Sequence, residues 1–97
     1  YGNTFLFPVR PSLEETIDLY GNKLFYTHLK NYTTVPGAPR KMSASLDGGE
    51  INHRAYLEKL NSVGFTGPIG IEAPRSGDRL WFAKCDLAYT KQLMSEI

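Results

Sequence analysis

The sequence predicts an α/β fold in which parallel strands alternate with helices. Helical and strand-like patterns follow one another in the order helix, strand, helix, strand, helix within residues 11–95. Each predicted strand follows a helix after a short connection and leads into a loop, which is the arrangement of β/α units. The apolar content of 41% and the aromatic content of 12% suit a packed core.

The first helix is predicted in the segment PSLEETIDLYGN, residues 11–22. Ser12 and Glu15 have the spacing of a capping box, in which each side chain accepts a hydrogen bond from the backbone of the other residue. Gly21 is a favourable residue for ending the helix.

The first strand is predicted in KLFYTHLK, residues 23–30, because aromatic and β-branched residues favour a pleated sheet. Side chains alternate between the two faces of a strand. This alternation places Tyr26, His28 and Lys30 on one face of the strand. It places Phe25, Thr27 and Leu29 on the other face.

Residues 31–50 contain two prolines and three glycines and are predicted to form a long loop, which is often functional at such a length. A second helix is predicted from the N-cap Asn52 to Val63, and Gly64 ends it. The segment PIGIEAP, residues 68–74, predicts the second strand.

The third helix is predicted to open at Ser76-Gly77-Asp78 and to run to about Ser95. Its broad apolar arc is predicted to pack inward. This arc comprises Leu80, Trp81, Cys85, Leu87 and Ala88. We expect Cys85 in the core and Trp81 as a core or interface anchor.

The 97 residues are enough for one small domain. The 11 basic and 10 acidic residues nearly cancel, which argues against a nucleic-acid partner. No apolar run approaches the ~20 residues that a membrane span needs, so we expect no membrane partner. The single cysteine, Cys85, allows no internal disulfide and fits a reducing, cytoplasmic location.

Two parallel strands are too few for a stable sheet that is covered on both faces. We therefore expect further strands to complete the fold, either from sequence outside these residues or from a second chain. A homo-oligomer is one way to supply them.

Polar residues at the ends of both strands suggest a site. His28 and Glu72 each lie at or near the last residue of a predicted strand, on the face opposite the aliphatic residues. In β/α barrels the carboxyl ends of the strands carry the active site. Imidazole and carboxylate are ligands for a divalent metal, but two ligands do not complete a metal site. A hydrogen-bonded core histidine is the structural alternative for His28.

Four segments in order resemble the C-terminal part of the xylose isomerase-like TIM barrels, the sugar phosphate isomerase/epimerase superfamily. They are THLKN at 27–31, DGGEINH at 47–53, GFTG at 64–67 and IGIE at 69–72. Asn31 stands where Asp is common in the family, and Asn52-His53 replaces Asp-Trp. The resemblance implies that residues 1–97 are the C-terminal part of a single (β/α)₈ domain whose upstream strands lie outside this chain.

The family site implies a divalent metal, Mn²⁺, Mg²⁺, Co²⁺ or Zn²⁺, held by Glu, Asp, His and Glu. By this resemblance His28 is the histidine and Glu72 the last glutamate, and the other two ligands would precede Tyr1. The implied substrate is a sugar or similar α-hydroxy-carbonyl compound that reacts through an enediolate. Glu72 would also exchange the carbon-bound proton. Lys30 and Arg75 are candidate substrate-binding residues, with rim ion pairs as the alternative.

The implied activity is that of an isomerase or epimerase, and this chain alone is expected to be inactive. A dehydratase or lyase on the same fold is an alternative, as is a non-catalytic barrel fragment that acts as a binding or structural module. Endonucleases of the endonuclease IV type share the strand end, but they need an Asp-x-His pair after it, and residues 32–50 contain no histidine.

Overall fold

A computed structural model describes all residues from 1 to 97, and it has the mixed α/β character that the sequence predicts. The elements in chain order are α1 (Gly2–Phe5), α2 (Leu13–Tyr20), the 3₁₀ turn η1 (Gly21–Lys23), β1 (Thr27–Leu29), β2 (Asn31–Thr33), β3 (Met42–Ala44), α3 (His53–Ser62), β4 (Ile69–Ile71) and α4 (Arg79–Ser95). The predicted alternation of three helices with two strands is therefore present as α2, β1, α3, β4 and α4.

The three predicted helix starts are confirmed by their caps. Ser12 and Glu15 form the complete capping box of α2. The side chain of Asn52 accepts a hydrogen bond from Ala55 N at the start of α3, and that of Asp78 accepts one from Trp81 N at the start of α4. These bonds satisfy backbone donors that have no partner inside the helix.

The predicted loop of residues 31–50 is only partly a loop, because β2 and β3 form an antiparallel hairpin within it. The register pairs Asn31 with Ala44 and Thr33 with Met42. Gly37 adopts a φ of 83° in the connection, a value that favours glycine. The turn residues were correctly located, but the strand pairing on either side of them was not predicted.

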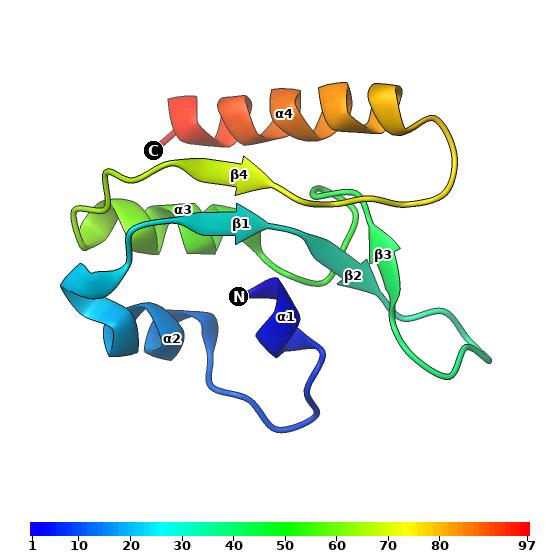
Figure 1. Cartoon of the computed structure of the whole chain (residues 1–97), viewed down its shortest axis with the longest axis horizontal. Coiled ribbons are helices and arrows are strands. Elements are labelled where there is room, and N and C mark those ends of the chain that lie inside the picture. The colour runs from blue at the N-terminus through cyan, green and yellow to red at the C-terminus, as the bar shows by residue number, and fades with distance from the viewer.

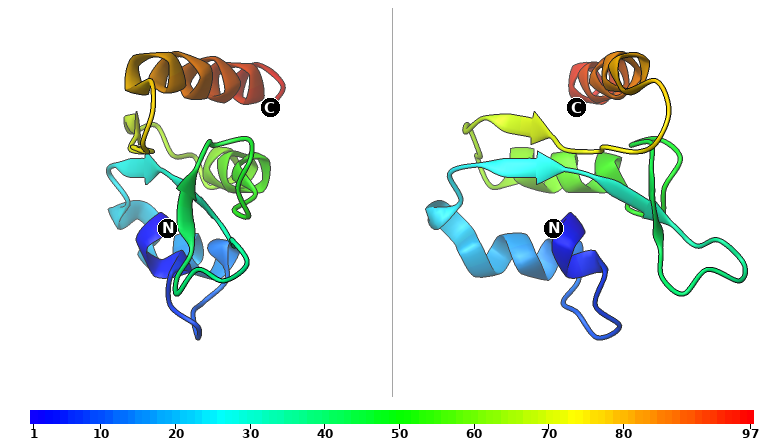
Figure 2. Two further views of the ribbon diagram at one scale, coloured as in Figure 1. Left: turned by 90° about the vertical axis from the view of Figure 1, so that its right-hand side faces the viewer. Right: turned by 45° about the vertical axis from the view of Figure 1, so that its right-hand side comes forward.

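Strands β1 and β4 pair in parallel, with His28 opposite Gly70 and Leu29 opposite Ile71. Helix α3 connects them and lies behind the pair in Figure 1, while α2 lies beside β1 and α4 beside β4. The two views of Figure 2 show no helix on the other face of the strands. The pair therefore has one covered face and one open face.

The core lies between the covered face and the helices. Its most buried aliphatic side chains are Ile17, Leu29, Leu46 and Leu60. Thr27 and Leu29 point into it as predicted, and the Thr27 hydroxyl is hydrogen-bonded to that of Tyr56 on α3. Only 16 of the 97 residues are buried, so much apolar surface remains in contact with solvent.

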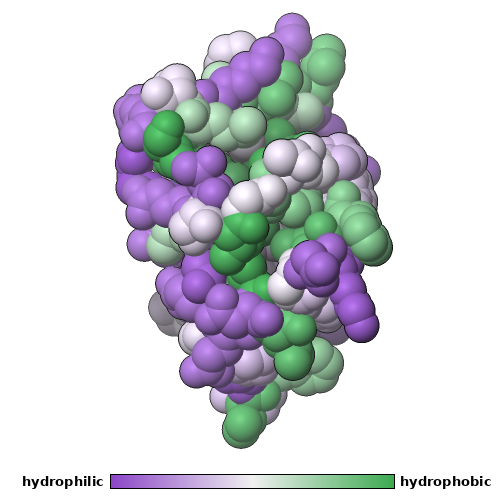
Figure 3. Space-filling model, turned by 90° about the vertical axis from the view of Figure 1, so that its left-hand side faces the viewer, coloured by the Kyte–Doolittle hydropathy of each residue, from purple (hydrophilic) through white to green (hydrophobic).

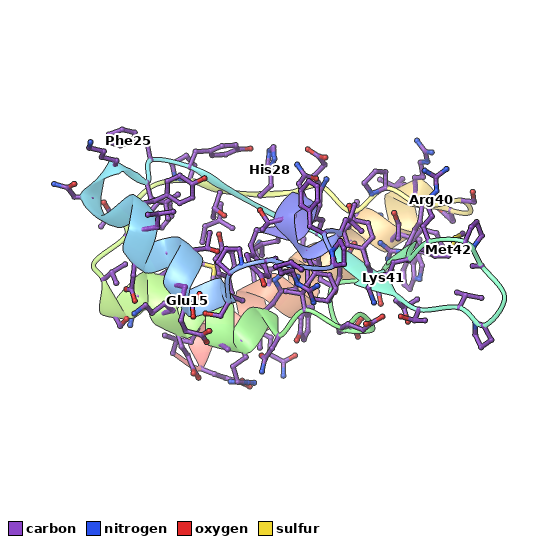
Figure 4. All side chains as sticks on the ribbon, turned by 90° about the horizontal axis from the view of Figure 1, so that it is seen from below. Glu15, Phe25, His28, Arg40, Lys41 and Met42 are labelled. Carbon is purple, nitrogen blue, oxygen red and sulfur yellow. The ribbon has the colours of Figure 1, made fainter.

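Phe25 was predicted on the core face but is 76% exposed. The strand begins only at Thr27, so Phe25 precedes the regular alternation. It lies at the end of the molecule where the strands start (Figure 4). Figure 3 views this end and shows apolar patches between hydrophilic ones. Exposed Leu19 lies in α2, and exposed Val63 follows α3 directly.

Helix α4 packs through a different face from the predicted one. Leu80, Trp81 and Cys85 are exposed, so the expectation that this arc lies in the core is wrong for the isolated chain. The buried residues of α4 are Asp86, Thr90 and Leu93. A buried ion pair between Asp86 and Arg75 explains this orientation, because it turns Asp86 toward the body of the protein.

None of the helices combines the length and the apolar character that crossing a bilayer requires.

Candidate functional site

The ends of β1 and β4 bring His28 and Glu72 together. Glu72 N donates a hydrogen bond of 2.9 Å to Leu29 O, which extends the ladder by one residue beyond β4. The side chains then meet on the open face, with 3.3 Å between His28 Nδ1 and Glu72 Oε2. Figure 4 shows His28 pointing away from α3. The predicted juxtaposition of these two residues is thus present.

Lys30 joins this pair from the end of β1. Its Nζ donates 2.8 Å to Glu72 Oε1 and 3.0 Å to Asn3 Oδ1, and only 14% of its side chain is exposed. The hydrogen bond from Lys30 holds the pKa of Glu72 below its usual value, and the same bond raises the pKa of Lys30. Both groups are therefore charged at neutral pH, and Glu72 is an ionised carboxylate.

Two glycines make room for these side chains. A Cβ at Gly70 would lie 2.5 Å from Tyr26 Oη and 3.0 Å from His28 Cδ2. The rings of Tyr26 and His28 meet edge to face at 4.7 Å between centroids, directly over this glycine. A Cβ at Gly2 would lie 2.1 Å from Lys30 Cγ. A residue with a side chain at Gly70 would displace Tyr26 or His28, and one at Gly2 would displace Lys30. The group of His28, Lys30 and Glu72 is called the cluster below.

His53, the first residue of α3, lies buried beneath the site. It is 3% exposed, and its Nε2 lies 2.9 Å from Lys30 O. A carbonyl only accepts, so Nε2 carries the proton and Nδ1 is a buried acceptor with no partner. The hydrogen-bond partner of His53 is the backbone carbonyl of a residue 23 positions earlier in the chain. No local sequence pattern could have revealed this contact.

Burial lowers the pKa of His53, while the Lys30 carbonyl and Asp86 oppose the shift and the Tyr1 amino group adds to it. Because the unfolded chain has the ordinary pKa of ~6.5, it binds the proton more readily than the folded protein does. The free energy of unfolding should therefore fall as the pH drops below about 6.5, by up to about 1.4 kcal/mol per pH unit.

Urea denaturation at about pH 5 and about pH 7.5 measures this loss. His53→Gln removes the titrating group and can still donate to Lys30 O, so its stability should change less between the two pH values. His28→Gln is the matched control, because His28 is the other histidine and is exposed. An equal pH dependence in His53→Gln and the unsubstituted protein would show that His53 is not the group responsible.

Asn31 fixes the loop that follows the hairpin. It is 1% exposed, and its amide donates to Leu46 O at 2.8 Å and Ile51 O at 3.1 Å. Its Oδ1 accepts from Tyr32 N at 2.9 Å and Ile51 N at 2.8 Å. Gly49 packs directly against the Asn31 side chain, because a Cβ at this position would lie only 2.1 Å from Asn31 Cγ. Sequence reasoning placed Asn31 in a motif but did not find this role.

Arg75 is held by Asp86. Its Nη1 lies 2.9 Å from Asp86 Oδ2 and donates 2.8 Å to Ala73 O, and its guanidinium lies 4.4 Å from the centroid of the Phe82 ring. Arg75 and Glu72 line the same surface pocket. The structure thus gives Arg75 a structural ion pair near the site, and its contact with a substrate stays a prediction.

The cluster contains side chains of the types that bind a divalent metal, but it contains too few of them. An imidazole nitrogen and a carboxylate oxygen converge, as metal binding requires. No group of three or more His, Cys, Asp or Glu side chains is arranged to hold an ion. His28 and Glu72 are thus two donors of the types that a divalent metal takes, which is fewer than a complete metal site needs.

No family model, no curated protein and no solved structure matches this chain.

Proposed function

We propose that residues 1–97 form the C-terminal part of a (β/α)₈ barrel that catalyses a metal-dependent isomerisation or epimerisation of a sugar-like α-hydroxy-carbonyl compound. The observation that carries this proposal is the approach of His28 Nδ1 to Glu72 Oε2 at 3.3 Å. The two side chains project from the carboxyl ends of paired parallel strands onto a face that no helix covers.

The arrangement of the strands supports the barrel. A barrel strand carries a helix on its outer side and presents alternate residues to the barrel interior. Here α3 covers the face of Thr27 and Leu29, whereas His28 belongs to the open face. The outer edges of β1 and β4 have no strand partner, as the addition of further barrel strands requires.

The residues of the cluster have distinct roles in this proposal. His28 and Glu72 would hold the metal, which polarises the carbonyl of the substrate when it is bound. Glu72 is ionised at neutral pH and can accept the proton from the carbon next to that carbonyl. Lys30 keeps Glu72 ionised and orients it through the bond to Oε1. With two of its three ammonium hydrogens donated to Glu72 and Asn3, Lys30 has one left for a substrate oxygen.

The proposal is tested by elemental analysis of the intact protein together with exchange of the carbon-bound proton of α-hydroxy-ketone sugars with deuterium from solvent. We expect one divalent metal per site, and His28→Ala should lower this occupancy by removing one ligand. A protein without stoichiometric metal that exchanges no proton would be a binding or structural module instead.

A further prediction concerns the chain alone, which should self-associate. Open strand edges and exposed apolar faces favour association, and Leu80 on α4 is 68% exposed. Light scattering after size exclusion at several concentrations measures this. Leu80→Lys should reduce the association, whereas Val9→Lys, at a loop position that is even more exposed (91%), should not. A cooperatively melting monomer at all concentrations would contradict the prediction.

A further inference from the structure

Helix α4 carries an exposed stripe of alternating apolar and basic side chains. Its members follow one another at helical spacing and therefore share one side of the helix, namely Leu80, Lys84, Leu87 and Lys91. All four are exposed, and exposed Trp81 lies next to Leu80. Exposed leucines beside a tryptophan are typical of a surface that binds another protein.

The exposed charges of α4 all have the same sign. Arg79, Lys84 and Lys91 are exposed, and none of them forms an ion pair. The one acidic residue within α4, Asp86, is buried and is paired with Arg75. Because opposite charges attract across an interface, the α4 stripe fits a partner surface that is acidic and partly apolar.

Helix α2 has the opposite character. Its eight residues include no basic side chain and three acidic ones, Glu14, Glu15 and Asp18, all of them exposed. Glu14 and Asp18 are four residues apart and lie on the same side of the helix. Glu14 forms no ion pair, and the Asp18 side chain stays 62% exposed although it contacts Lys59. Exposed Leu19 adds an apolar group, so α2 offers the surface that the α4 stripe fits.

Helices α2 and α4 lie too far apart to meet within one chain. Helix α2 lies on the β1 side of the parallel pair and α4 on the β4 side, and Figures 1 and 2 agree on this separation. Both helices run antiparallel to the strands in Figure 1. A second copy can therefore set its α2 along α4 of the first copy while the strands of both copies point the same way.

We propose that the α4 stripe binds α2 of a second copy of this chain, head to tail. The charges select this pairing, because an α4–α4 contact would bring cations against cations and an α2–α2 contact carboxylates against carboxylates. The contact joins two different surfaces, so repetition produces a ring or an open row of copies and not a dimer with twofold symmetry. The inference uses neither His28 nor Glu72 and does not depend on the proposed catalytic function.

Reversal of the charges on each helix tests the pairing, with analytical ultracentrifugation at several concentrations as the measurement. Lys84→Glu/Lys91→Glu makes the α4 stripe acidic, and Glu14→Lys/Asp18→Lys makes α2 basic. Each variant alone opposes like charges and should self-associate on the order of 10-fold more weakly than the unsubstituted protein. An equimolar mixture of the two should associate again, because every α2 then finds an α4 of opposite charge.

Two further variants separate this effect from other causes. Arg40→Glu reverses an exposed charge in the connection between β2 and β3, so it should associate as the unsubstituted protein does. Glu14→Lys alone should still weaken the association, and it leaves the ion pair of Asp18 and Lys59 intact if loss of that pair impairs folding. Circular dichroism of each sample verifies that the variant is folded.

Salt provides a second measurement. The screening length falls from about 10 Å at 0.1 M salt to about 3 Å at 1 M, so the association should weaken over this range. A protein that is monomeric at every concentration, a mixture that stays dissociated or an association that salt does not weaken would overturn the inference. Weakening by the α4 variant without weakening by the α2 variants would also overturn it, because α4 would then bind a different surface or a different protein.

Discussion

Replacement of Glu72 by Gln should lower the rate of proton exchange by about 10²–10⁴-fold, which is the usual cost of losing a general base. The amide cannot accept the proton from carbon, and it is a poorer metal ligand than the carboxylate. Folding should change little, because the Glu72 carboxylate is 48% exposed, and ion pairs of exposed carboxylates contribute little to stability.

The measurement is deuterium exchange under saturating substrate, with metal content and melting temperature recorded for the same samples. Glu96→Gln is the matched control, since Glu96 is a comparably exposed carboxylate in an ion pair with Arg54 at the far end of the chain. If Glu72→Gln retains both full metal content and the unsubstituted exchange rate, the metal-dependent mechanism is wrong, and Lys30, Glu72 and His28 form only a surface ion cluster.

Replacement of Asn31 by Ala should destabilise the protein by roughly 3 kcal/mol or more, because four hydrogen bonds are lost and three of them lie in the buried interior. The backbone groups concerned are Leu46 O, Ile51 O, Ile51 N and Tyr32 N. Removal of one partner costs more than the bond itself contributes, since a buried donor or acceptor without a partner carries the full cost of desolvation.

Urea denaturation of Asn31→Ala against Asn22→Ala measures this effect. Asn22 is exposed in η1 and its side chain forms no hydrogen bond within the protein, so its replacement should change the free energy of unfolding by less than about 0.5 kcal/mol. Equal stabilities of the two variants would mean that water takes over the partners of Asn31 and that the loop from Leu46 to Ile51 is not fixed by this side chain.

The features that the sequence predicted well are those with local causes. Ser12, Asn52 and Asp78 cap helices through bonds that span three residues, and each helix begins where its cap indicates. The position of His28 beside Glu72 also follows from simple rules, because parallel strands align their carboxyl ends.

The features that the sequence did not reveal have distant causes. The hairpin of β2 and β3 depends on pairing across a turn whose residues are equally typical of an irregular loop. Helix α4 carries apolar residues around most of its circumference, and the long-range bonds of Asp86 to Arg75 and to Leu46 N decide which face is buried. The burial of His53 likewise depends on the carbonyl of Lys30.

Gly70 gives the open face an unusual sensitivity to mutation. Replacement by alanine, one of the smallest changes possible in a protein, introduces a methyl group where Tyr26 and His28 already meet. A single substitution can therefore shift the Tyr26 ring and press on His28 while every charged residue stays in place.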